Sequence, residues 1–427
     1  MAGLAAALAA RPPAERALHD GHRWLSVGDL VPDVAGAAPP ADGAVPVDGA
    51  LPHVAVRALA GALQAGRTPV VVPPGAGPDG VAALLAAAAA LPAGHLVLPT
   101  SGTTSAPRAV LRTVASWDAA LEPFTAVTGS GAGDVAWAPG PATSTLTLWA
   151  LWHALSAGVP VVATGPWRGV PAGPGVLDGV TVLHCVPAVL ADVLVAREAG
   201  ALPALRTAVV AGAAVPGALR ARTAGQGVRL VEYYGAAELS FVAVDADGAG
   251  LRPFPGCEVR VRGGELEVLS PYVSLGYLVP GTDGPWRRTA DGWAGVGDQG
   301  RIGAGGVVEV AGRGDAALSV GGQVVLTADV ERTLGAVEGV LDVACWGTED
   351  ARLGQRACAA VATDLPVTAH PALLTRLRAA ARAGLPAAAR PVRYAVVPAL
   401  PRTPAGKPDL QRVRALVPAT TRTAGAR

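Results

Sequence analysis

One residue near the C-terminal end differs chemically from every other cation of this chain. Of the 34 lysine and arginine residues only Lys407 is a lysine, and it lies in the proline- and glycine-rich stretch 401–409, which predicts a loop. An ammonium group is a compact charge on a flexible stem, whereas a guanidinium is a planar fork. Lys407 is therefore a candidate for a cation that pivots between two anionic oxygens. The alternative is that this lysine is a chance exception in a chain that otherwise uses arginine.

A second candidate for chemistry is the stretch from Thr100 to Arg108. It reads TSGTTSAPR and has five hydroxyl residues in its first six positions, after a predicted strand at 96–98. Hydroxyl groups and backbone N–H groups with a cation at one end suit a polyphosphate. The Walker motif is absent. The alternative is an ordinary turn rich in serine and threonine.

The surrounding pattern predicts the elements that hold these residues. Between 51 and 234, short β-branched runs alternate with alanine-rich helical stretches, which predicts α/β units around a largely parallel, buried sheet. The expected strands are 69–72, 96–98, 159–163, 180–183, 208–210 and 229–231.

The character of the chain changes after residue 257. Short strands and glycine turns up to about 310 predict an antiparallel, barrel-like subdomain. Beyond it we expect a small, mobile α+β domain with helices at 329–335 and 371–383 and strands at 340–346, 357–362 and 393–397. The predicted fold class is α/β, with an N-terminal domain at 1–312, a C-terminal domain at 313–427 and a hinge at 312–322.

Composition excludes several classes of partner. The net charge of +1 gives no electrostatic footprint for nucleic acid or an anionic membrane. The apolar run 81–91 is too short to span a bilayer and predicts a core helix, and the apolar N-terminus predicts an amphipathic helix rather than a signal peptide. The four cysteines show no metal-ligand spacing and predict buried, reduced thiols in a cytoplasmic protein.

Five short motifs resemble, in order, the signatures of the adenylate-forming (ANL) superfamily. The hydroxyl-rich stretch resembles SGTTGxPK, 234–238 resembles YGxTE, 297–301 resembles GDxGR, 312–322 resembles GRxD…KxxG, and 401–409 resembles PxTxxGKxD. Any one motif is weak, but the ordered set spans residues from about 19 to 412. The sequence around 232–241 is most similar to short bacterial fatty-acyl-CoA ligases, and the short segment ahead of the phosphate loop is similar to o-succinylbenzoate–CoA ligases.

The resemblance implies an ATP- and Mg²⁺-dependent ligase that forms an acyl-adenylate and passes the acyl group to coenzyme A. It implies catalytic roles for Lys407, Glu238 and Thr103, with Glu238 as the magnesium ligand and Asp315 at the hinge. The implied ATP and AMP contacts are Thr100, Ser101, Gly102, Thr103, Thr104, Arg108, Gly212, Ala213, Tyr234, Gly235, Asp298 and Arg313.

Each implied role has a structural alternative. Glu238 could be an exposed glutamate at a helix start, Asp298 a turn-forming aspartate, and Arg313 a partner in a salt bridge beside the hinge. Tyr234 and the segment 211–213 could be ordinary residues at the edge of the core.

Four positions depart from the family pattern. Ser105, Arg108, Ala237 and Ser319 replace a glycine, a lysine, a hydroxyl residue and a lysine respectively. A catalytically degenerate AMP-binding protein is therefore one alternative to an active enzyme.

The acyl pocket predicted by the resemblance is apolar. The stretch 137–146 has no acidic residue for a substrate amino group, which argues against an α-amino acid, and small residues there favour a fatty or related acid. An o-succinylbenzoate–CoA ligase is the second alternative, but no arginine lies in 137–155 or 182–190 for a second carboxylate. His184 is expected to be a core histidine. Two points stay open. The acyl acceptor is either free coenzyme A or a separate acyl carrier protein, and the oligomeric state is either monomer or homodimer.

Overall fold

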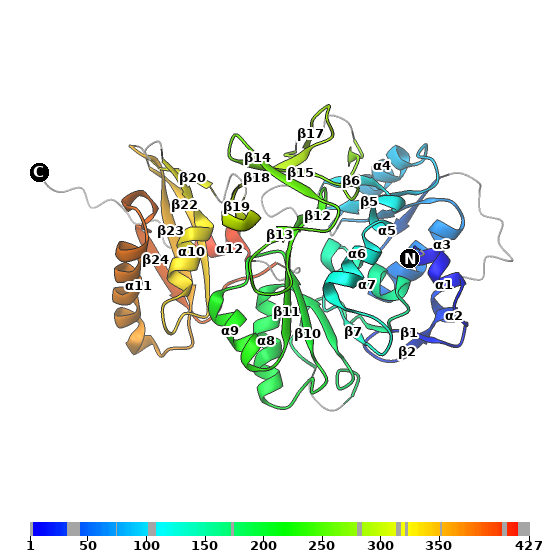
Figure 1. The fold of residues 1–427 in the computed structure, drawn as a ribbon, viewed down its shortest axis with the longest axis horizontal. Helices are drawn as coiled ribbons and strands as arrows, with labels where there is room; N and C mark the ends of the chain where they lie inside the picture. Colours follow the sequence, from blue (N-terminus) through cyan, green and yellow to red (C-terminus); the bar gives the residue numbers. More distant parts are fainter. Residues whose placement is uncertain are drawn as a thin grey trace, which may run out of the picture. The chain divides into compact units, whose positions relative to one another are not determined.

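The computed structural model describes residues 3–31, 43–73, 75–100, 108–171, 175–279, 284–312, 317–320, 323–350, 352–403 and 408–416. These residues form two compact units (Figure 1). The first is built mainly from residues 3–296 and 302–309, and the second mainly from 297–301, 310–403 and 408–416. The predicted domain boundary at 312 stays a prediction. None of the described helices has the length and apolar character needed to cross a membrane.

Among the described residues, the largest sheet has nine strands and a parallel centre. In sheet order its strands are β13 (Arg252–Pro253), β12 (Ser240–Asp245), β11 (Arg229–Ala236), β10 (Thr207–Ala211), β9 (Val182–Cys185), β7 (Ala136–Trp137), β8 (Val161–Val162), β1 (Arg16–His19) and β2 (Trp24–Ser26). The strands from β11 to β1 pair in parallel. All five residues of β10 are buried, as expected for a strand covered on both faces.

Two further sheets contain other strands up to residue 312, and the third sheet lies after the predicted change of character at 257. The second sheet has the order β16 (Gly276–Tyr277), β6 (Ala109–Thr113), β5 (His95–Pro99), β4 (Thr68–Val71) and β3 (Ala44–Val47). The third has the order β14 (Glu258–Arg262), β15 (Glu265–Leu269), β18 (Ala294–Ile302) and β17 (Arg287–Arg288), with β19 (Val308–Gly312) beside β18. The pairs β14–β15 and β17–β18 are antiparallel, in agreement with the prediction for 257–310.

In the described part of the first unit, nine helices precede or connect these strands. They are α1 (Leu4–Ala9), α2 (Val27–Leu30), α3 (Pro52–Gln64), α4 (Pro78–Ala88), α5 (Val114–Asp118), α6 (Leu121–Thr128), α7 (Thr145–Ser156), α8 (Pro187–Glu198) and α9 (Gly217–Gly225). The helix α7 is buried around almost its whole circumference, which explains why its sequence is apolar on every face. Figure 1 shows α8 and α9 beside β10 and β11.

Two predictions about burial were wrong. The helix expected at 81–91 is a surface helix, because Ala88 is the only buried residue of α4. Alanine side chains bury little apolar area, so an alanine-rich run does not require a core position. Among the four cysteines, all free, Cys257 is only partly buried, whereas Cys185, Cys345 and Cys358 are buried as predicted.

The second unit is a smaller α+β fold. Its strands are β21 (Gln323–Leu326), β20 (Ala317–Val320), β23 (Gly354–Ala362), β22 (Asp342–Asp350) and β24 (Arg393–Val397), and its helices are α10 (Thr327–Gly335), α11 (His370–Gly384) and α12 (Leu410–Ala415). Val330, Leu334, Leu373 and Leu377 of α10 and α11 pack in one apolar cluster with the sheet. Their spacing of four residues places each pair on one helix face.

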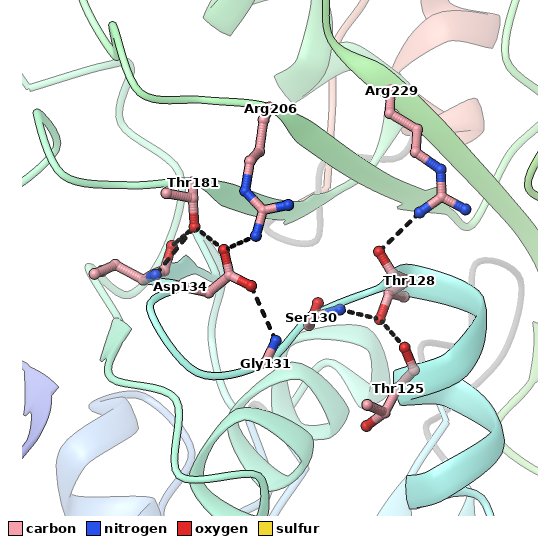
Figure 2. A network of polar contacts seen from close by, with 9 residues as sticks. Thr125, Thr128, Ser130, Gly131, Asp134, Thr181, Arg206 and Arg229 are labelled. Carbon is pink, nitrogen blue, oxygen red and sulfur yellow. Dashed lines mark hydrogen bonds and ion pairs between the residues drawn. The ribbon is translucent and has the colours of Figure 1, made fainter.

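A polar network ties together the amino ends of the central strands (Figure 2). The Asp134 carboxylate, which is 1% exposed, accepts hydrogen bonds from the Thr181 hydroxyl at 2.5 Å and the Gly131 N–H at 2.9 Å, and it pairs with Arg206. Asp134, Thr181 and Arg206 each lie one or two residues before β7, β9 or β10. The network therefore fixes these strands at the edge opposite their carboxyl ends.

Candidate active site

The two stems of the hydroxyl-rich loop are joined to each other. The strands β5 and β6 pair antiparallel up to Pro99 and Ala109. Beyond them, the Thr100 N–H donates to the Arg108 carbonyl at 2.8 Å, and the Arg108 N–H donates to the Thr100 hydroxyl at 2.9 Å. The loop therefore leaves a β-hairpin whose base is closed by Thr100 and Arg108.

Glu238 lies in the turn of a second hairpin. The strands β11 and β12 pair antiparallel, with Ala236 opposite Ser240. Gly235 is required here because a Cβ atom on it would lie 1.9 Å from the Ser240 carbonyl oxygen. Glu238 is only 2% exposed, so the alternative of an exposed glutamate at a helix start was wrong.

One segment holds Glu238 beside the hydroxyl-rich hairpin. The Glu238 carbonyl accepts a hydrogen bond from the Ser274 N–H at 2.8 Å, and its Oε1 accepts one from the Tyr277 hydroxyl at 2.9 Å. Tyr277 lies in β16, opposite Val110 of β6. The Arg108 guanidinium carbon lies 5.9 Å from the centre of the Tyr277 ring, within range of a cation–π interaction. Tyr277 thus contacts both Glu238 and the cation at the end of the loop.

Burial of Tyr277 and the nearby negative charge of Glu238 have an electrostatic consequence. Together with the hydrogen bond to Glu238, they raise the pKa of Tyr277 to about 12. The phenol therefore stays protonated at neutral pH and donates its hydrogen to the carboxylate.

Arg112 is a residue of the site that the sequence reasoning missed. It is fully buried, and its guanidinium donates to the Tyr272 carbonyl at 2.5 Å and to the Ala237 carbonyl at 3.4 Å. Burial lowers its pKa to about 9 while the charge of Glu238 opposes that shift, so Arg112 remains a cation at neutral pH. The available signal was the alternation of β6, which places Arg112 on the same inward face as Val110.

The predicted adenine contacts lie at the carboxyl ends of two adjacent parallel strands. Gly212 and Ala213 follow β10 directly and are exposed, and Tyr234 and Gly235 lie near the end of β11. Because Ala211 pairs with Tyr233, these two segments are neighbours at one edge of the sheet. Tyr234 is partly buried against Leu239 and other residues of an apolar cluster, as the core-edge alternative requires, and stacking on adenine stays a prediction.

The second unit carries the stems of the loop that contains Lys407. Arg402 and Pro408 form an antiparallel bridge, and the Asp409 N–H donates to the Pro401 carbonyl at 2.8 Å. Arg402 also forms an ion pair with Asp342 at the start of β22. Asp298 lies in β18 and is 5% exposed, so it belongs to a strand and not to a simple turn.

Several predicted positions lie outside the described residues. These are Ser101, Gly102, Thr103, Thr104, Ser105, Arg313, Asp315 and Lys407. Their roles stay predictions. Ser319 lies in β20, opposite Val324.

The residues around Glu238 suit a metal ion that takes most of its ligands from the bound nucleotide and water. Within the described ranges, no cluster of three or more histidine, cysteine or acidic residues could hold a metal by itself. Mg²⁺ commonly uses one or two carboxylates together with phosphate oxygens and water, so the single carboxylate of Glu238 fits that pattern.

His184 belongs to the core, as predicted. It is 3% exposed and its ring stacks on Phe124 with the ring centres 6.0 Å apart. Burial lowers its pKa to about 3, so the ring is neutral at physiological pH.

Two family models match the chain. The model described as AMP-binding enzyme covers residues 95–285, and the model described as AMP-binding enzyme C-terminal domain covers 329–407. The first range contains the two hairpins that position Arg108 and Glu238, and the second reaches Lys407.

One curated relative and two solved structures illustrate the similarity. A probable 2-succinylbenzoate–CoA ligase of Mycobacterium tuberculosis is 34% identical over 215 residues, which is 49% of this chain and 53% of that protein. The match thus spans about half the length of this relative. An anthranilate CoA ligase with anthranoyl-AMP has a TM-score of 0.79 at 17% identity, covering 97% of both chains. E. coli MenE with bound OSB-AMS has a TM-score of 0.74 at 22% identity, covering 94% of this chain and 95% of that one. At these identities the two structures establish the fold.

Proposed function

Because the chain belongs to the AMP-binding enzyme family, we propose that it is an ATP-dependent acid–thiol ligase acting on a fatty or related carboxylic acid. The first step is the attack of a carboxylate oxygen on the α-phosphorus of ATP. A new P–O bond forms, the bond to the β-phosphate oxygen breaks, and pyrophosphate leaves. In the second step a thiolate attacks the acyl carbon and AMP leaves with the electron pair of the C–O bond.

The position of Tyr277 between Arg108 and Glu238 carries this proposal. Two anions must approach each other in the first step, so the chain must supply positive charge and fixed positions. Arg108 and the hydroxyl-rich loop would hold the β- and γ-phosphates, and Glu238 would face the same phosphates from the neighbouring hairpin. When bound, Mg²⁺ would neutralise phosphate charge beside Glu238.

Lys407 would contact the carboxylate and the α-phosphate during the first step. Asp298 would accept hydrogen bonds from the ribose hydroxyls, and Gly212, Ala213 and Tyr234 would line the adenine. The second unit would then turn at Asp315 and withdraw Lys407 before the thiol arrives. Coenzyme A is the proposed acceptor, and an acyl carrier protein is the alternative.

Exchange of radioactive pyrophosphate into ATP with a panel of acids tests the proposal. We expect exchange with apolar monocarboxylic acids in the presence of Mg²⁺, and thioester formation when coenzyme A is added. ATP binding without exchange for any acid would overturn the proposal and support a nucleotide-binding protein without turnover, which the departures at Ser105 and Arg108 leave as a second candidate.

The o-succinylbenzoate–CoA ligase reading rests on the Mycobacterium tuberculosis relative. That substrate carries a second carboxylate, which needs a cationic partner when it is buried. Exchange with o-succinylbenzoate alone would establish this reading in place of the first.

A further inference from the structure

A small pocket lies where the order of the central strands reverses. From β7 the chain passes through α7 to β8 on one side, and then returns to β9 on the other side of β7. Ligands of open α/β sheets bind at the carboxyl ends of the strands at such a switch point. The pocket lies there, between Gly140 after β7 and Cys185 and Val186 at the end of β9.

The lining of this pocket is electrically neutral. Its lining residues with polar side-chain groups are Ser144, Thr147, Cys185 and Trp167, and none of them is an acidic or basic residue. Burial raises the pKa of Cys185 well above its ordinary value, so the thiol is uncharged at neutral pH. A carboxylate buried here would have no cationic partner in the lining, which disfavours a dicarboxylic acid strongly.

The pocket is too small for an acyl chain as it stands. Its free volume is about 10 Å³, which is room for roughly one water molecule. A substrate must therefore displace part of the wall. Cys185, Val186 and Val189 are each less than 9% exposed and belong to β9 or the start of α8, so they are fixed by the core.

Trp167 is a part of the wall that the core does not bury. It lies in the loop after β8 and is partly exposed. Its indole N–H donates to the exposed carboxylate of Asp192 on α8 at 3.1 Å, and its ring lies 5.9 Å from that of Trp137. The base of this loop is fixed, because Gly165 forms an antiparallel bridge with Gly140 and the Trp137 indole donates to the Thr164 hydroxyl at 3.3 Å.

We propose that Trp167 is the residue that limits acyl size, and that the pocket takes the neutral tail of an apolar monocarboxylic acid. This inference rests on the proposed function for its substrate class. The indole forms the outer wall against the tail, and Asp192 holds the indole in place. Removal of the indole opens the pocket to solvent-exposed space, so longer tails can enter.

The test compares wild type, Trp167→Ala and Asp192→Ala in pyrophosphate exchange with straight-chain monocarboxylic acids of increasing length. For Trp167→Ala we expect kcat/KM to keep rising with length beyond the wild-type optimum, by about fourfold for each added methylene that becomes buried. Asp192→Ala should shift the optimum in the same direction, but less. An ω-carboxylated acid of equal length should not support exchange in wild type.

Trp293→Ala is the matched control. Trp293 is partly exposed and packs against Arg260, with the guanidinium 4.1 Å from the ring centre, and it is not part of the pocket lining. It should leave the length profile unchanged. An unchanged profile in Trp167→Ala, with the melting temperature of wild type, would overturn the inference.

A binding measurement separates this inference from the proposed reaction. The same acids are titrated into wild type and Trp167→Ala by calorimetry. If no acid supports exchange but the variant binds longer acids more tightly than wild type does, the pocket assignment stands and the reaction is wrong. If exchange occurs in wild type and neither exchange nor binding depends on Trp167, the reaction stands and the assignment is wrong. Absence of both exchange and binding overturns both.

Discussion

The Tyr277 hydroxyl donates a hydrogen bond to Oε1 of Glu238 across 2.9 Å, and Glu238 is almost completely buried. A hydrogen bond to a charged group is worth about 1.5–3 kcal/mol, and a buried carboxylate that loses a donor retains its desolvation cost. Tyr277 is thus positioned to fix the orientation of the carboxylate that we assign to the metal.

Tyr277→Phe should lower the rate of adenylation about tenfold or more and raise the Mg²⁺ concentration needed for half-maximal exchange. The measurement is exchange at varied Mg²⁺. Tyr272→Phe is the matched control, because its hydroxyl donates at 2.8 Å to a backbone carbonyl, that of Pro255. Equal losses in both variants would show that the effect of Tyr277 is one of general stability.

Lys407→Ala should reduce acyl-adenylate formation by about 100-fold or more and largely spare thioester formation from an acyl-adenylate supplied directly. The reason is that the proposed charge is needed only while two anions meet. Lys407→Arg separates charge from geometry, since it keeps the charge on a planar fork. A similar fall in both half-reactions would remove the assigned role.

The ion pair between Arg402 and Asp342 should matter for the same half-reaction. It fixes one stem of the Lys407 loop against β22. Arg402→Ala and Asp342→Ala should each slow adenylation more than thioester formation, and the double variant should show a coupling of about 1 kcal/mol. Additive losses would mean that the pair does not act as a unit.

Glu331 predicts a pH dependence of stability within the second unit. Burial raises its pKa from 4.5 to about 7. The native state therefore holds this proton at pH values where the unfolded chain has lost it, so stability from this group is complete below pH 4.5 and falls as the pH rises towards 7. Glu331→Gln keeps an oxygen that can accept the hydrogen bond given by the Cys345 N–H.

Chemical unfolding of wild type and Glu331→Gln checks this expectation. The variant should be more stable than wild type by up to about 3 kcal/mol above pH 7, and nearly equal to it at pH 4. A constant difference across this range would show that Glu331 does not titrate between the two limits.

The Asp134 network should contribute to stability and leave substrate choice unchanged. Asp134→Ala leaves Thr181 and the Gly131 N–H without their partner and should cost about 2–3 kcal/mol. Arg206→Ala leaves the buried Asp134 carboxylate with only its two neutral hydrogen-bond donors and should cost about 1–3 kcal/mol. The order of acids in the exchange assay should be the same in both variants; a changed order would contradict a purely structural role.

The sequence alone predicted many of the elements in their order, and it supplied the residue types and motifs from which we propose the chemistry. The apolar run 208–210 was predicted as a strand and lies within β10, and the helices predicted at 329–335 and 371–383 lie within α10 and α11. The hydroxyl-rich stretch could be selected from its residue types, whereas Glu238 was selected because 234–238 resembles a family motif. Periodicity failed for α4, since alanine is compatible with either a core or a surface helix.

Only the tertiary structure decided which distant residues meet. Arg112, Tyr277 and Trp167 have no motif, and their importance comes from the β6–β16 pairing and from the reversal of strand order between β8 and β9. A single sequence records the side chain at each position but not the pairing of strands that lie far apart along the chain. The contact between Tyr277 and Glu238 depends on the pairing of β16 with β6. The place of Trp167 in the pocket wall depends on the order of β8, β7 and β9. The fold was therefore needed to identify both.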